Sequence, residues 1–164
     1  MLDGAQLVMD LEDVVVCQWG NVLLRVGTRT PQEEHIELLH ETFERMLDTY
    51  PRVGLLAYLP DGAPLPDGAA RLRAVSMLRS LGPRLGGMVV VAQGTGFWAS
   101  AARSVITGLT LMARVAFPVK VTSSAADGCE WLGARFEPGV DAEALLRLTE
   151  QLGARLVRPT AEAS

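Results

Sequence analysis

A glycine turn between two predicted elements is the stretch whose residues are best suited to chemistry. Gln93-Gly94-Thr95-Gly96 follows an apolar run, Met88 to Ala92, and precedes a long apolar segment that begins at Phe97. Backbone N–H groups at the start of a helix favour an anion, and Arg103, one helical turn or more further along, would reach back toward it. The turn lacks the third glycine of a dinucleotide fingerprint and the Gly-Lys-Ser/Thr ending of a phosphate loop. A plain tight turn is therefore the favoured interpretation, and an enzyme acting on a phosphorylated substrate the least favoured.

The remaining polar residues form no catalytic or metal-binding pattern. His35 and His40 are five residues apart on a predicted helix, so they do not share a face, and no cysteine or carboxylate completes a metal set with them. Cys17 and Cys129 lie far apart in apolar patterns and are expected to be thiols of the core. We therefore expect no catalytic residue, no metal and no cofactor, and we predict that the chain is not an enzyme.

Composition and charge indicate a cytoplasmic, globular protein. The chain has 164 residues, 49% of them apolar, which fits one domain with a mild apolar excess. The net charge of −4 argues against a nucleic-acid partner, since such binding relies on cationic side chains that neutralise phosphates. Neither a signal peptide nor a membrane span of about 20 apolar residues is recognisable. Lys120 is the only lysine, which we interpret as the arginine bias of a GC-rich bacterial genome.

Apolar periodicity and turn residues predict an α/β domain. Strands alternating with helices indicate a mixed, mostly parallel sheet of about five strands that opens with a hairpin and is flanked by helices. We divide the chain into a leader at 1–13, the domain at 14–136, an appended C-terminal helix at 137–158 and a disordered tail at 159–164. The predicted strands are 14–19, 22–26, 53–59, 88–92 and 119–122, and the predicted helices are 30–50, 69–81, 97–115, 124–132 and 142–155.

Local signals mark the starts of several of these helices. Thr30 is placed to cap the first helix, with Pro31 at its first position and Glu33 completing a capping box. Ser124 is placed to cap the short fourth helix, and Asp141 precedes the last one. Between the third strand and its following helix, the proline- and glycine-rich segment 60–68 is the longest predicted loop and follows a strand end, where α/β domains place ligands.

The predicted helix at 97–115 is apolar around much of its circumference. A helix of that kind is either buried or lies at an interface. We consider both, because scattered apolar side chains are also common on protein surfaces. The interface interpretation predicts that a protein partner or a second copy of the chain contacts the apolar residues Trp98, Val105, Ile106, Leu109 and Met112.

Several segments resemble the STAS-like domains of anti-sigma-factor antagonists, which are related to the lipid-binding CRAL-TRIO domains. The segments are GNVLLRV, TPQEEHIELLHETFERML, VGLLAYL, GMVVVAQG and PVKVTSSAADGCEWL, and the resemblance covers residues 14–134. It implies a STAS-like sheet and a regulatory role. STAS antagonists carry a phosphorylatable serine in the turn after the third strand, whereas here that turn reads PDGAPLPDGAARLR. This departure excludes a phosphorylation switch at that position.

Together these observations predict a non-enzymatic regulatory or protein-interaction module. It would bind a protein partner, with homodimerisation through the 97–115 helix as one form of that interaction. The alternative is a carrier or sensor of an apolar small molecule or lipid, held in a cavity under the same helix.

Overall fold

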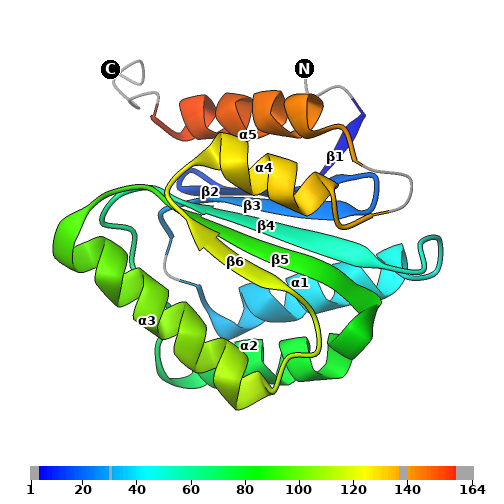
Figure 1. Ribbon diagram of the computed structural model, residues 1–164, viewed down its shortest axis with the longest axis horizontal. Coiled ribbons are helices and arrows are strands. Elements are labelled where there is room, and N and C mark those ends of the chain that lie inside the picture. Colours follow the sequence, from blue (N-terminus) through cyan, green and yellow to red (C-terminus); the bar gives the residue numbers. More distant parts are fainter. Residues whose placement is uncertain (1–3, 30, 137–139, 158–164) are drawn as a thin grey trace.

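A single six-stranded sheet organises the chain. The computed structural model describes residues 4–29, 31–136 and 140–157. The strands lie in the order in which they occur in the chain, with β1 to β3 antiparallel and β3 to β6 parallel (Figure 1). They are β1 (Ala5–Asp10), β2 (Val14–Trp19), β3 (Val22–Gly27), β4 (Val53–Leu59), β5 (Leu85–Ala92) and β6 (Val119–Thr122).

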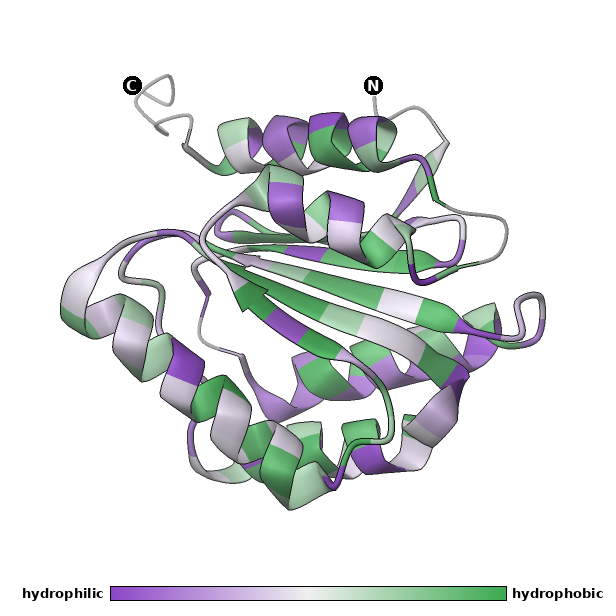
Figure 2. Ribbon diagram, viewed as in Figure 1, coloured by the Kyte–Doolittle hydropathy of each residue, from purple (hydrophilic) through white to green (hydrophobic). Residues whose placement is uncertain are grey.

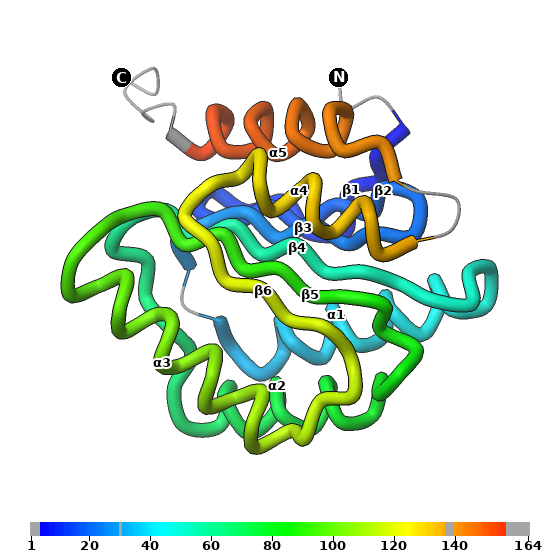
Figure 3. The backbone as a smooth tube through the Cα atoms, viewed as in Figure 1, coloured from blue at the N-terminus to red at the C-terminus, as the bar shows by residue number. Residues whose placement is uncertain are grey.

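Helices cover both faces of this sheet. Three crossover helices, α1 (Glu33–Met46), α2 (Gly68–Leu81) and α3 (Gly96–Ala113), lie on one face, and a short 3-10 turn, η1 (Gly82–Arg84), follows α2. The other face is covered by α4 (Ala125–Gly133) and α5 (Ala142–Val157), as the path of the backbone in Figure 3 makes clear. The fold is therefore a three-layer α/β arrangement, with the parallel strands placing their carboxyl ends along one edge.

Each face of the sheet has its own apolar core. Phe43, Met46, Leu23 and Leu81 are among the fully buried side chains on the face of α1 to α3. The opposite core contains Leu24, Leu56, Leu132, Leu145, Leu148 and Leu152. Figure 2 shows the same division, because apolar colour is concentrated in the central strands while α5 alternates between polar and apolar residues. This double burial explains why β3, β4 and β5 read as continuous apolar runs.

The α/β class, the N-terminal hairpin and the mostly parallel sheet are confirmed, but the number of strands is six rather than five. The additional strand, β1, lies in the segment predicted to be a leader and pairs antiparallel with β2. The hairpin turns at Gly20, whose φ of 58° lies in the left-handed region that a two-residue turn requires.

The start of the first helix differs from its predicted capping. Gln32 occupies the cap position without a side-chain hydrogen bond, and the helix begins at Glu33 rather than at Pro31. Thr30, the predicted cap, lies outside the described residues. By contrast, Ser124 Oγ accepts a hydrogen bond from the Asp127 amide at 3.2 Å, as its position predicted.

The C-terminal helix is built into the domain. Asp141 Oδ1 accepts hydrogen bonds from the amides of Glu143 and Ala144 at 3.1 and 3.2 Å, so the predicted start is confirmed. Its apolar stripe packs on β2, β3 and α4 within the second core. At its far end, Arg155 forms an ion pair of 2.6 Å with Asp10 of β1. The helix predicted as an appendage thus closes one face of the sheet. The predicted tail lies outside the described residues.

Candidate functional site

The outer face of α3 carries the two most exposed large apolar side chains of the described chain, Phe97 and Leu111. Phe97 is 90% exposed, Leu111 72% and Met112 48%. Phe97 and Leu111 lie on the side of α3 opposite its buried stripe of Ala102, Ile106, Leu109 and Ala113. Exposed apolar groups gathered on one element are typical of an interaction surface.

Small residues separate the two large side chains on this face. Ser100, Ser104 and Gly108 recur every four residues between Phe97 and Leu111, and a Cβ added to Gly108 would meet no atom of the chain within 4 Å. The middle of this helix face therefore carries only small side chains, and each end carries one large apolar side chain. Small residues at this spacing let a second helix approach closely.

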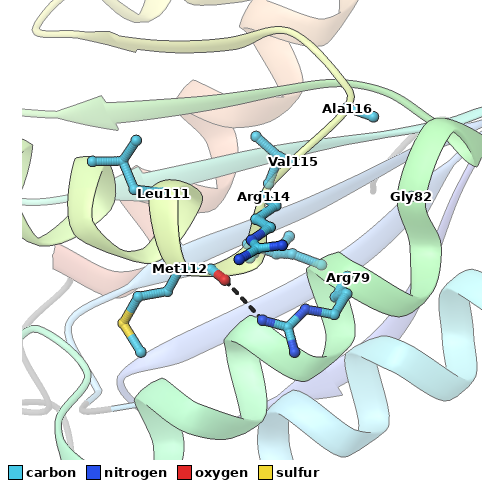
Figure 4. A pocket seen from close by; sticks show the side chains of 9 residues that line it. Arg79, Gly82, Leu111, Met112, Arg114, Val115 and Ala116 are labelled. Carbon is cyan, nitrogen blue, oxygen red and sulfur yellow. Dashed lines mark hydrogen bonds between the residues drawn. The ribbon is translucent and has the colours of Figure 1, made fainter.

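A groove of about 830 Å³ lies beside the C-terminal end of α3 (Figure 4). Leu111, Met112 and Arg114 line it from α3 and its cap, and Leu78 and Arg79 line it from α2. Arg79 Nη2 donates a hydrogen bond of 2.8 Å to the Met112 carbonyl oxygen, which ties the end of α3 to α2. The groove is thus lined by polar as well as apolar surface, and the exposed Arg79 and Arg114 supply its charge.

Arg114 has an unusual backbone for its residue type. It forms the C-cap of α3 with φ of 50° and ψ of 52°, the left-handed conformation for which glycine is the usual residue. For a residue with a Cβ that conformation costs roughly 1 kcal/mol or more. Despite this cost, a charged residue rather than glycine occupies the cap, and it lines the groove.

Most of the residues predicted to contact a partner do not lie on the exposed face of α3. Ile106 and Leu109 are 9% and 5% exposed and pack in the core, so they belong to the buried stripe of α3 rather than to its surface. Val105 is half-buried against the same core. Trp98 donates a hydrogen bond of 3.0 Å from Nε1 to the Ala63 carbonyl oxygen and so holds the 60–68 loop against α3. Of the five, Met112 alone is well exposed.

The predicted anion site is not assembled around its arginine. Arg103 Nη1 lies 3.5 Å from the Val121 carbonyl oxygen, toward β6 rather than toward the turn. Gly94 has a φ of 131°, and a side chain there would collide with the carboxylate of Asp61. Thr95 is the cap residue of α3 but makes no side-chain cap hydrogen bond. A carboxylate beside the turn disfavours an anion, and the geometry fits the tight-turn interpretation.

A second hollow, apolar and partly open to solvent, lies between the sheet and the three crossover helices. Its volume is about 120 Å³. The floor is formed by Leu55, Ala57 and Leu59 of β4 with Met88 and Val90 of β5, so it faces the carboxyl-terminal half of the parallel strands. Its walls come from α1, α2 and α3. The partly exposed members of its lining are Ala57, Ala74, Pro31, His35 and the prolines and leucine of the segment 64–66.

One charged side chain reaches this apolar hollow. Arg25 of β3 lies beside Ala57 in the sheet, lines the hollow and is only 8% exposed. Its Nη2 donates a hydrogen bond of 2.8 Å to the Arg29 carbonyl oxygen, while Arg29 Nε pairs with Asp13 at 2.6 Å. Burial lowers the pKa of the Arg25 guanidinium to about 10, and the carboxylate of Asp13 offsets part of that effect. Arg25 therefore remains a cation at neutral pH.

Of the other polar groups singled out in the sequence, only His35 lies at one of these two sites, at the rim of the hollow. Cys17 and Cys129 are free and buried, and burial raises the pKa of each thiol to about 11. His40 pairs with Glu44 at 3.6 Å on α1. Within the described residues no cluster of three or more histidine, cysteine or carboxylate side chains could hold a metal ion. Nor does any helix in the described ranges combine the length and apolarity needed to cross a membrane.

Comparison with known proteins adds no family. Neither a protein-family model, nor a curated protein, nor a solved structure matches the chain. The STAS-like resemblance therefore remains a prediction from sequence.

Phe97, Leu111 and Arg25 are among the residues of these sites that the sequence analysis did not identify. The signal for the first two was present, because both lie diametrically opposite the stripe of Ala102, Ile106 and Ala113 when residues are placed 100° apart. Arg25 was hidden inside the run Val22 to Val26, where a single charge in a strand usually points to solvent. Only the three-dimensional fold places it beside an apolar hollow.

Proposed function

We propose that this chain is a non-enzymatic interaction module that associates with a second copy of itself through the outer face of α3. The single observation that carries the proposal is the 90% exposure of Phe97 on the same helix face as Leu111, which is 72% exposed. Exposing two such side chains is costly in water, and covering them is favourable by roughly 25 cal/mol per Å² of apolar surface.

The layout of this face favours a second copy over an unrelated partner. Ser104 lies midway between Phe97 and Leu111 in the sequence. A twofold axis through Ser104 therefore pairs two antiparallel α3 helices so that Phe97 of each copy meets Leu111 of the other. Ser100 then faces Gly108, and both are small enough for close packing. A self-complementary face of this kind is what a symmetric dimer requires.

The groove beside Leu111 gives the phenyl ring of the second copy a place to lie. In the antiparallel arrangement Phe97 of one copy approaches Leu111 and Met112 of the other, where the groove opens. Arg79 and Arg114 line that groove, and a guanidinium group over the face of an aromatic ring is favourable by about 0.5–1 kcal/mol at exposed sites. A mixed lining of apolar side chains and two arginines therefore suits an aromatic side chain.

Cysteine cross-linking tests this arrangement directly. In a Ser104→Cys variant the two introduced thiols lie beside the twofold axis, so mild oxidation is expected to give a disulfide-linked dimer as the main product. The native cysteines do not compete, because both are buried. The measurement is the fraction of dimer on a non-reducing gel.

Ser100→Cys is the matched control on the same exposed face. Its two copies lie on opposite sides of the axis, separated by about 12 Å along the helices, whereas a disulfide needs a Cα–Cα distance of roughly 4.4–6.8 Å. We expect little cross-linking for this variant. Equal cross-linking of the two variants, or none with Ser104→Cys, would reject the proposed antiparallel pairing.

The hollow under α3 favours a second candidate function, the binding of an apolar small molecule. We infer this candidate from an apolar space of about 120 Å³ that lies over the carboxyl-terminal half of β4 and β5 and is enclosed by the crossover helices. That volume fits a small apolar molecule rather than a lipid, since an engineered apolar cavity of roughly 150 Å³ accommodates benzene. A carrier or sensor of such a molecule would use the 60–68 loop as its cover.

The STAS-like resemblance supports a regulatory role for either function. It extends over residues 14–134, so β1 and α5 lie outside it. Protein association and ligand sensing are both compatible with a cytoplasmic regulatory domain, and we propose that assignment on the resemblance alone.

A further inference from the structure

We propose that the hollow between the sheet and the crossover helices binds a small apolar monocarboxylate, whose carboxylate is held by Arg25. This inference rests on the second candidate function and names its ligand class. An apolar space lined by a single buried cation at its edge matches a molecule with an apolar body and one negative end.

The packing around Arg25 explains why an anion is preferred. Within the described residues its guanidinium makes one hydrogen bond, to the Arg29 carbonyl oxygen, although the planar group carries several further N–H donors. Asp13 is the nearby acidic group, and its carboxylate is already paired with Arg29 at 2.6 Å. Arg25, Arg29 and Asp13 therefore leave a net positive charge at this edge of the hollow. These further donors are not among the buried unpaired atoms of the described chain, so they remain accessible and a carboxylate can accept charge-assisted hydrogen bonds from them.

The lining limits the body of the ligand. Apart from Arg25 and His35, every lining side chain is apolar, from Leu55 and Met88 on the sheet to Leu109 on α3. The volume of about 120 Å³ is suited to one aromatic ring or a short alkyl chain. The ligand is expected to enter the hollow through the partly exposed part of its lining. Pro31 and His35 lie on one side of this opening, and the segment 64–66 lies on the other.

Benzoate and benzyl alcohol provide a matched pair of probes for the wild-type chain. They share the phenyl ring and differ in charge, so their dissociation constants, measured by two-dimensional NMR titration at equal ionic strength, isolate the contribution of the carboxylate. We expect benzoate to bind at least about tenfold more tightly, because a hydrogen-bonded pair of charges is stronger than its neutral counterpart. The shifted amides should be those of β4, β5 and the start of α1.

Substitutions at Arg25 and at Ala74 test separately where the carboxylate and the apolar body of the ligand bind. Arg25→Met is expected to remove the preference for benzoate without weakening benzyl alcohol, while Arg25→Lys retains part of the preference. Ala74→Leu adds a larger side chain to the wall of the hollow and is expected to weaken both probes at least about tenfold. Ala69→Leu, an exposed position on the same helix, is the matched control and should change neither.

The outcomes separate this inference from the function on which it rests. Equal binding of both probes to the wild-type chain, lost in Ala74→Leu, would overturn the monocarboxylate inference but keep a neutral apolar ligand. Binding of neither probe, or binding that Ala74→Leu does not alter, would overturn both. If Arg25→Met does not fold, the ratio of the dissociation constants of the two probes, measured on the wild-type chain and on Arg25→Lys, still shows whether Arg25 holds the carboxylate.

Discussion

Replacing Gly108 by leucine is expected to convert the proposed dimer into a monomer and, at the same time, to make that monomer more stable. Gly108 faces outward from α3, and a Cβ at this position would meet no atom within 4 Å. Leucine has a higher helix propensity than glycine, so the free energy of unfolding of the monomer should rise by about 0.5–1 kcal/mol. The same side chain would fill the middle of the proposed interface and push the two α3 helices apart.

Urea unfolding and light scattering together check this prediction. Unfolding, followed at a concentration where both proteins are monomeric, gives the change in stability, and light scattering gives the loss of the dimer. Gly108→Ala is the matched control, since it raises helix propensity but adds only one methyl group to the face. A Gly108→Leu protein that is more stable and still dimeric would show that α3 does not form the interface.

Replacing Leu145 by alanine is expected to lower the free energy of unfolding by about 3–5 kcal/mol. Leu145 is fully buried in the second core, between α5 and the sheet. Removing its side chain forfeits the transfer free energy of the deleted methyl and methylene groups and leaves a cavity. A loss of this size is a large part of the stability of a typical domain.

The comparison with Leu72→Ala decides whether α5 belongs to the folding unit. Leu72 lies on α2 and is 63% exposed, so its truncation should change the free energy of unfolding by no more than about 0.5 kcal/mol. Both variants are measured by urea unfolding. If Leu145→Ala costs no more than Leu72→Ala, α5 would not belong to the cooperative folding unit.

Signals that act over a few residues were sufficient to predict most of the fold. The hairpin at Gly20, the continuous apolar strand Val53–Leu59 and the caps at Ser124 and Asp141 are each specified by adjacent residues. The strand β1 was not predicted, because it is an edge strand with an irregular register. Within it, only Ala5, Val8 and Met9 are partly buried. Its pairing with β2 determines that it is a strand, and a neighbouring strand is not visible in a short window of sequence.

The candidate sites were harder to predict because they depend on orientation in space. α3 is apolar on several sides, so its sequence did not reveal that Ile106 and Leu109 face the core while Phe97 and Leu111 face water. Only the packing of α3 beside α2 and the sheet fixes that rotation. The hollow at Arg25 gathers side chains from three helices, three strands and two loops, and such a set has no periodic pattern in the chain.

The oligomeric state of the wild-type chain tests the central claim most directly. Light scattering coupled to size exclusion, repeated over a wide range of loading concentrations, gives the molar mass without any substitution. Self-association through α3 predicts a mass that approaches twice the chain mass of 17.6 kDa as concentration rises. A mass that stays at 17.6 kDa up to millimolar concentration would contradict the proposed homodimer and leave the exposed face of α3 to a different partner.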